Sequence, residues 1–429
     1  MKHRCKYDPP DGLNLLTFSR IQCFRTCVRK EFWSYRCGIR RDRTSAPLRV
    51  GSSFHLGVDA WFRNGLDDDK AVAEAIADWN QYPAWAKSDA LKYDFLCERQ
   101  LVIELLYAYF DQWRDDPDLL VLETESAFEV PILNPATRRP TPLFRFAGRR
   151  DGIVTFEGMR AIQEIKTTSS DIESEQYWTR LRIDQQATGY FLATILQGHG
   201  IDTILWDVVR KPELRPSLVD VLDDGRDVNG IPIVVNEKGK RLRWKDFYKS
   251  IGAEPLEGDP DPDEWIQDPK AFPGSQIRYS PIYRDGAGRR CWKKNGEPYR
   301  SKPKDVPDAY RLQAMEEPEA YGERVAAELR QNPDRYFARR EVPRIAADVR
   351  QYQRELWTIA HDIHRAAKNG DDTRNSGACF NYNSACPFFE ACTSGERLEE
   401  LEEYELNERG FRLIPFAHEE LADIYTEGN

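Results

Sequence analysis

The sequence lacks several features that would define large classes of protein. No apolar run approaches the roughly 18 residues needed to cross a membrane, which argues against a membrane protein. The N-terminus, Met1-Lys2-His3-Arg4, has no apolar signal segment, so we expect a cytoplasmic protein. There is no Gly-x-x-x-x-Gly-Lys-[Ser/Thr] loop, so a helicase or ATPase working with it would be a separate chain. Internal repeats are also absent.

Net positive charge is lacking too, since the 429 residues carry a formal net charge of -10. Such a balance does not by itself indicate a nucleic-acid-binding protein. The charge is uneven, however: residues 1–50 hold twelve Lys and Arg against four Asp and Glu, a balance of +8. This asymmetry is compatible with a local basic groove and, equally, with solvated helix faces.

The nine cysteines are not expected to form disulfides in the cytoplasm. Cys379, Cys386 and Cys392 fall within fourteen residues of a loop-like segment that also contains Pro387. Such a placement suits metal or cluster ligands better than core packing. A closed site needs a fourth ligand, and thiolates alone do not distinguish zinc from an iron–sulfur cluster.

Changes in hydrophobic periodicity divide the chain into four parts. Residues 1–115 read as a helical region, and 116–210 as an α/β core. Residues 211–310, rich in proline, glycine and charge, read as an insertion with a basic stretch at 289–304. Residues 311–429 read as helices followed by the cysteine-bearing loop.

Individual elements are predicted from the same patterns. We expect helices at 15–33, from the Gly51-Ser52-Ser53 start onward, at 71–79, 93–113 and 183–196, and between 307 and 367. We expect strands at 121–130, 143–146 and 203–209, and a hairpin formed by 153–156 and 161–166.

Two acids and a lysine form the first candidate site. Residues 148–152 predict a tight glycine turn that carries Asp151, and a strand containing Glu164 and Lys166 follows. Residues two apart on a strand project from the same face, so Glu164 and Lys166 project together. A carboxylate in a mostly apolar strand needs a partner, and oxygen ligands suit Mg²⁺ or Mn²⁺.

Two further features accompany this set. Gln186 and Tyr190 lie four apart on a predicted helix and therefore share one face. His55 lies beside the apolar stripe of another helix. Taken alone, each has an ordinary structural interpretation: a core tyrosine beside a surface glutamine, and a packing histidine.

In this order, the motifs resemble the RecB-like branch of the PD-(D/E)XK nuclease superfamily, and more narrowly its iron–sulfur members. These are the AddB-type nuclease domains, cysteine-bearing CRISPR-associated exonucleases, and related phage and plasmid exonucleases. The motifs that carry the resemblance are Gly51-x-x-x-His55, Asp151-Gly152, Glu164-x-Lys166, Gln186-x-x-x-Tyr190 and the cysteine pattern. The resemblance implies a restriction-endonuclease-like core, a mixed sheet flanked by helices.

The resemblance also implies roles for these residues. His55, Asp151 and Glu164 would ligate Mg²⁺ or Mn²⁺, and Lys166 would orient or help deprotonate the attacking water. Gln186 and Tyr190 would position their helix against the site and the phosphate.

A structural [4Fe–4S] cluster is implied at Cys27, Cys379, Cys386 and Cys392, with zinc as the alternative. Cys23 is the alternative to Cys27 as first ligand. The gap between Cys379 and Cys386 is wider than in the AddB type, so the loop differs in shape.

The predicted activity is a metal-dependent deoxyribonuclease, an exonuclease on single-stranded DNA or DNA ends. Arg20, Arg29, Lys30 and Arg149 are the predicted DNA contacts. The rival hypotheses are a non-catalytic DNA-binding or recombination-partner protein on the same fold, and a zinc-stapled structural protein.

Overall fold

The computed structural model describes residues 5–220, 276–279, 283–284, 290–294, 297–299, 310–381 and 384–426. The predicted insertion at 211–310, with its basic stretch at 289–304, lies largely outside these residues. The chain divides into two compact units. The first comprises Met1–Asp78, Leu105–Pro212 and Glu328–Asn429, and the second comprises Trp79–Glu104 and Glu213–Ala327. No helix among the described residues is long and apolar enough to cross a membrane.

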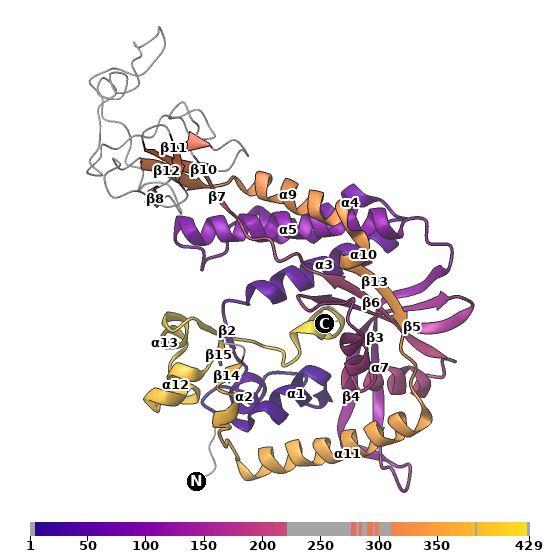
Figure 1. Cartoon of the computed structure of the whole chain (residues 1–429). Coiled ribbons are helices and arrows are strands. Elements are labelled where there is room, and N and C mark those ends of the chain that lie inside the picture. Colours follow the sequence, from indigo (N-terminus) through magenta and orange to yellow (C-terminus); the bar gives the residue numbers. More distant parts are fainter. Residues whose placement is uncertain are drawn as a thin grey trace. The chain divides into compact units, whose positions relative to one another are not determined.

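A six-stranded mixed sheet forms the centre of the first unit (Figure 1). Its main path runs β1 (Leu15–Leu16), β4 (Pro140–Phe156), β5 (Met159–Thr168), β6 (Thr203–Arg210) and β13 (Phe337–Glu341), and β3 (Leu119–Leu133) pairs with β4. β4 and β5 form the predicted antiparallel hairpin, whereas β5 and β6 run parallel. The mixed sheet with flanking helices confirms the predicted fold class.

One face of this sheet is covered by α6 (Glu175–Leu181), α7 (Gln185–Leu196) and α11 (Ala346–Asn369). Alternate residues of each strand enter this core, for example Phe128 and Val130 on β3 and Ile204 and Trp206 on β6. This period of two is the one expected of strands with one face against helices. The sequence pattern therefore sets which strand residues face α7.

The opposite face carries a buried polar network centred on Asp207 of β6, which is fully buried. Its Oδ2 accepts hydrogen bonds from Tyr109, Gln163 and Arg339 at 2.7, 3.0 and 2.8 Å. Tyr109 lies in the C-terminal part of α5 (Asp89–Trp113) and packs edge-on against Phe54 of α3 (Ala46–Arg63). The network therefore fixes β5 and β6 beneath the helices of this face.

The beginning and end of the chain fold together within the first unit. β2 (Ile39–Arg41) pairs antiparallel with β16 (Phe411–Leu413), and Trp33 donates a hydrogen bond to Glu399 at 2.8 Å. The other elements of this region are α1 (Phe18–Thr26), α2 (Val28–Glu31), the π-helical turn η1 (Phe32–Arg36), α12 (Phe389–Ser394) and α13 (Glu403–Glu408). Short pieces complete it: η4 (Ser376–Ala378), β14 (Phe380–Asn381), β15 (Ser384–Ala385), η5 (Leu398–Glu400), η6 (Glu419–Leu421) and α14 (Ala422–Thr426).

The remaining helices are α4 (Asp68–Ala75), η2 (Ala77–Asn80), α9 (Pro318–Gln331) and α10 (Pro333–Tyr336). In the second unit, β7 (Leu218–Asp220), β12 (Tyr310–Met315) and β8 (Gln276–Tyr279) form one sheet, and β11 (Glu297–Tyr299), β10 (Arg290–Lys294) and β9 (Tyr283–Arg284) form another.

Three predictions about elements were wrong. Leu15 and Leu16 form β1, parallel to β4, and the helix begins only after the N-cap Thr17. Within the segment predicted as helical, residues 310–315 form β12, which pairs with β7 and β8, and residues 337–341 form a strand that extends the sheet beyond β6. The helix that carries His55 starts at Ala46, well before Gly51.

The predicted glycine turn before Asp151 is also absent, because Gly148 and Gly152 both lie inside the continuous strand β4. Gly148 is instead required by close packing. A Cβ atom there would lie 2.7 Å from the Phe128 ring and 3.1 Å from the Tyr190 ring.

Candidate active site

The site lies where β4 and β5 stop pairing. Gly152 and Gln163 form the last pair of their antiparallel ladder, so Asp151 and Glu164 stand just beyond it. The carboxylate of Asp151 replaces the missing backbone partner, since its Oδ2 accepts a hydrogen bond from the Ile165 amide at 2.6 Å. This divergence leaves room for two carboxylates from neighbouring strands.

Glu164 is 3% exposed, and its Oε2 atom is buried with no hydrogen-bond partner among the described residues. Burial raises the pKa of Glu164 well above its ordinary value, Asp151 raises it further, and Lys166 opposes the rise. A buried carboxylate oxygen without a partner is unfavourable unless a cation or a proton satisfies it. The position of Glu164 therefore suits a cation ligand.

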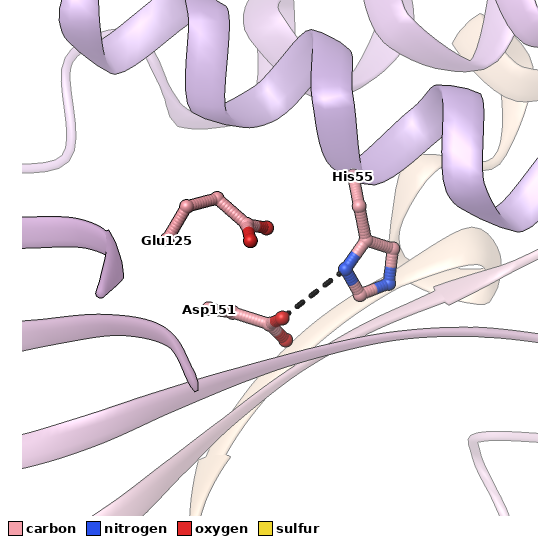
Figure 2. A group of neighbouring side chains, drawn as sticks. All are labelled: His55, Glu125 and Asp151. Carbon is pink, nitrogen blue, oxygen red and sulfur yellow. Dashed lines mark hydrogen bonds and ion pairs between the residues drawn. The ribbon is translucent and has the colours of Figure 1, made fainter. Parts of the chain in front are cut away.

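His55 reaches the same place from α3, and its Nδ1 lies 3.3 Å from Asp151 Oδ1 (Figure 2). Burial alone would lower the pKa of His55, but the charge and hydrogen bond of Asp151 outweigh it, so the net shift is upward. The sequence motif and the tertiary contact thus agree on this pair.

Glu125 was missed by the sequence analysis. It lies on β3 opposite Asp151, between the pairs Thr124–Gly152 and Ser126–Arg150, and its φ of 43° is unusual for a non-glycine residue. Figure 2 shows its carboxylate facing those side chains. Ligand atoms of His55, Glu125 and Asp151 all lie within 4.8 Å of one another, a spacing that can hold a metal ion.

Burial, together with the charge of Asp151, raises the pKa of Glu125 to about 7. The sequence offered one signal for this residue: Glu123 and Glu125 alternate on a strand that precedes Asp151. Only the β3–β4 register selects Glu125 rather than Glu123.

Lys166 shares its strand face with Glu164, as predicted. Its Nζ lies 3.8 Å from Asp184 Oδ2 and 5.2 Å from the centre of the Trp206 ring. The side chain is 36% exposed, so the ammonium remains accessible from the cavity.

Gln186 and Tyr190 lie on one face of α7, which begins after the N-cap Asp184. Gln186 Nε2 donates to Tyr190 Oη at 3.5 Å. Burial and the charges of Glu164 and Asp151 raise the pKa of Tyr190 well above its ordinary value, so the phenol keeps its proton. Gly189 lets α7 approach α11, because a Cβ atom there would lie 2.7 Å from Tyr352 Oη.

A cavity of about 750 Å³ joins these side chains. Besides the residues above, α1, α3 and the C-terminal segment contribute to its walls, with Phe18, Ser52 and Glu420 among them. Lys211, which follows β6, also lines it. All six residues of the predicted catalytic and metal set line this cavity: His55, Asp151, Glu164, Lys166, Gln186 and Tyr190. Glu125, which was not predicted, lines it too.

The predicted DNA contacts occupy different environments. Arg20 is 2% exposed, pairs with Glu31 at 3.1 Å, and donates to the carbonyls of Leu13 and Leu15. This burial contradicts a DNA-binding role, because the guanidinium is fully used inside the protein. Arg29 pairs with Asp372 at 2.7 Å and is 23% exposed.

Lys30 is partly exposed on α2, outside the walls of the cavity. Arg149 does line the cavity, and both oxygens of Asp423 accept hydrogen bonds from its Nη2, at 2.5 and 2.6 Å. Its Nε lies 3.9 Å from Glu125 Oε2. Of the four predicted contacts, Arg149 is the one nearest to the candidate metal ligands.

The predicted cluster ligands come from two segments that lie against each other. Cys27 Sγ lies 3.9 Å from the Thr373 carbonyl, and Asn375 donates to the Thr26 carbonyl at 2.8 Å. The Cys386 amide donates to the Cys379 carbonyl at 2.8 Å.

The thiols of Cys27 and Cys386 also lie near Cys392, whose pKa is raised first by burial and further by these two groups. Burial raises the pKa of Cys23 to about 12, and Lys30, Glu31, Arg40 and Cys27 also influence it.

Residues 15–269, more than half of the chain, match the family model of the PD-(D/E)XK nuclease superfamily. The chain belongs to this superfamily. Its members are nucleases that use divalent metals such as Mg²⁺ or Mn²⁺, and the superfamily implies DNA as substrate. The PD-(D/E)XK match includes His55, Asp151, Glu164 and Lys166 but not the C-terminal cysteines. Comparison with curated proteins gives no match.

Proposed function

We propose that the protein is a metal-dependent deoxyribonuclease that acts as an exonuclease on single-stranded DNA or DNA ends. The observation that carries this proposal is the meeting of Asp151, Glu164 and Lys166 at the point where β4 and β5 diverge. His55 and Glu125 add two further ligand atoms beside Asp151. A non-catalytic DNA-binding protein would have no need of this complete set.

The donor groups fit Mg²⁺ or Mn²⁺. Asp151, Glu164 and Glu125 offer carboxylate oxygens, which these hard cations prefer, and His55 offers an imidazole nitrogen. A bound metal ion would satisfy the Oε2 atom of Glu164, which has no hydrogen-bond partner among the described residues. When bound, a divalent metal supplies Lewis-acid polarisation of the phosphate and lowers the pKa of a bound water.

The protein's own groups have separate tasks. The Lys166 ammonium orients the attacking water and offsets negative charge that develops on the phosphate. Tyr190, held by Gln186 and kept protonated, donates a hydrogen bond to a phosphate oxygen. Lys166 also forms an ion pair with Asp184, and this pair constrains the position of its ammonium group before substrate binds.

The shape of the cavity supports a strand or a strand end as substrate. Its walls come from the sheet, from α1 and α3, and from Glu420 near the C-terminus, so the site is bounded on several sides. A flexible single strand reaches such a site more readily than an intact duplex. Phe18 in the wall offers an aromatic ring for base stacking.

We also propose a structural [4Fe–4S] cluster held by Cys27, Cys379, Cys386 and Cys392. Cys386 and Cys392 pack against the apolar cluster of Phe32 and Phe388, which suits a shielded cofactor. Zinc held by the same four thiolates is the alternative, because the ligand type alone does not distinguish the two.

The direct test is cleavage of 5′- and 3′-labelled single-stranded, double-stranded and circular DNA with Mg²⁺ or Mn²⁺. Asp151→Ala and Lys166→Ala should each abolish cleavage while circular dichroism shows an unchanged fold. Asp362→Asn, which removes an acid from the exposed face of α11, is the control and should retain activity. Activity that survives both active-site substitutions would refute the proposal.

A further inference from the structure

Three basic side chains other than His55 line the active-site cavity, and they differ in how they are neutralised. Arg149 is held by both oxygens of Asp423, and Lys166 lies 3.8 Å from Asp184. Lys211 has no ion pair with any carboxylate in the described part of the chain. Among the described residues, Lys211 is thus the one lysine or arginine in the cavity wall that has no ion pair with a carboxylate.

The backbone fixes Lys211 close to the catalytic strand. Its amide donates to the Thr168 carbonyl at 2.7 Å, directly after the last β5–β6 pair, Thr168–Arg210. Thr168 follows Lys166 by two residues, a distance of about 7 Å along a strand. One nucleotide of an extended single strand spans a comparable length. The backbone of Lys211 therefore lies beyond that of Lys166 along β5 by about the length of one nucleotide.

We propose that Lys211 binds a backbone phosphate of the DNA strand adjacent to the phosphate that is cleaved. This inference rests on the proposed function, and it adds a substrate-binding position that neither the sequence motifs nor the superfamily match assigns. Thr167, whose side chain also lines the cavity next to this point, offers a hydroxyl donor to the same phosphate. The ligand recognised here is the charged sugar–phosphate backbone, independent of base sequence.

Physical chemistry explains why the ammonium is left without a carboxylate. Lys211 is about half-buried, and burial lowers the pKa of its amine, which marks an ammonium that gains from an anionic partner. A permanent carboxylate neighbour would compete with the substrate phosphate. A lysine with no ion pair among the described residues instead attracts a phosphate of the DNA strand. It does so next to the carboxylates that would bind a metal ion.

The experiment measures equilibrium binding of a fluorescein-labelled single-stranded oligonucleotide by anisotropy, in an Asp151→Asn background that prevents cleavage. Lys211→Met should raise Kd roughly tenfold and reduce the slope of log Kd against log salt by about 0.7, the value for one phosphate contact on a single strand. Lys211→Arg should restore most of both. Lys368→Met, which removes an exposed lysine from the last turn of α11, is the matched control and should change neither.

The outcomes separate this inference from the proposed function. If wild-type protein cleaves no DNA but Lys211→Met still weakens binding with the smaller salt slope, the cleavage proposal fails and the phosphate position stands. Unchanged Kd and slope in Lys211→Met would overturn the phosphate position even if the wild type cleaves DNA. In the cleaving protein, loss of kcat with unchanged KM would overturn it too, since it would place Lys211 in the chemical step.

Discussion

The imidazole Nδ1 of His55 lies 3.3 Å from Oδ1 of Asp151, although 96 residues separate them in the chain. The contact joins helix α3 to the strand that diverges from β5. Asp151 Oδ2 is meanwhile fixed by the Ile165 amide. Asp151 therefore presents its two oxygens to two different neighbours, and its orientation is set before any ligand binds.

Glu125→Gln should weaken divalent-metal binding, because it removes a carboxylate charge from the group formed with His55 and Asp151. We expect the Kd for Mn²⁺ to rise about tenfold or more, by analogy with the loss of groups that support metal ligands. Isothermal titration of EDTA-treated protein measures it. The control is Glu123→Gln on the same strand, whose side chain is 38% exposed. Equal Mn²⁺ affinities for the two variants would contradict a role for Glu125.

Asp423→Asn should strengthen DNA binding, because it releases Arg149 from its two hydrogen bonds to the Asp423 carboxylate. We expect Kd for a single-stranded oligonucleotide to fall roughly three- to tenfold, equivalent to about 1 kcal/mol. Anisotropy at constant salt measures it, with Asp362→Asn as a control for the change in net charge. Weaker binding by Asp423→Asn would instead mean that Asp423 holds Arg149 in its working position.

Cys27→Ser and Cys386→Ser should lower iron content and remove an absorption band at about 400 nm in anaerobically purified protein. Cys386→Ser should damage folding as much as activity, whereas Glu164→Gln should damage activity alone. Thermal unfolding and cleavage assays measure both effects. Cys23→Ser is the internal control, since Cys27 and Cys386, but not Cys23, are among the main groups that shift the pKa of Cys392. Loss of iron in Cys23→Ser but not in Cys27→Ser would reverse the ligand assignment.

His418→Gln should reduce the pH dependence of stability. Its Nε2 lies 3.1 Å from the Leu15 carbonyl oxygen and its Nδ1 lies 3.1 Å from the Thr17 hydroxyl, so a neutral ring that donates from Nε2 and accepts at Nδ1 satisfies both contacts. Burial, with Arg20 nearby, lowers the pKa of His418 to about 3.

Below pH 6.5, the ordinary pKa of histidine, the unfolded chain binds a proton at His418 that the folded chain does not bind. The free energy of unfolding therefore decreases as the pH is lowered. This group alone costs about 2 kcal/mol between about pH 7 and about pH 5. Urea unfolding of both proteins at the two pH values tests it, since the variant should lose that part of the difference. An equal pH dependence in the two proteins would contradict it.

Much of the fold could be predicted because it depends on local patterns. The period-two runs predicted the β4–β5 hairpin and β6, and the Gln186–Tyr190 spacing placed both residues on one face of α7. Errors arose where tertiary contacts overrode local preference. Leu15 and Leu16 form a strand because they pair with β4. Gly148 lies inside β4, where close packing leaves no room for a side chain, and forms no turn.

The sequence by itself determined the chemical groups of the site, because Glu164 and Lys166 share a strand face through the two-residue period alone. Tertiary structure decided which other groups join them. The β3–β4 register selects Glu125, burial removes Arg20 from the surface, and the end of β6 brings Lys211 into the cavity. These facts depend on pairings between residues far apart in the chain, which no local pattern specifies.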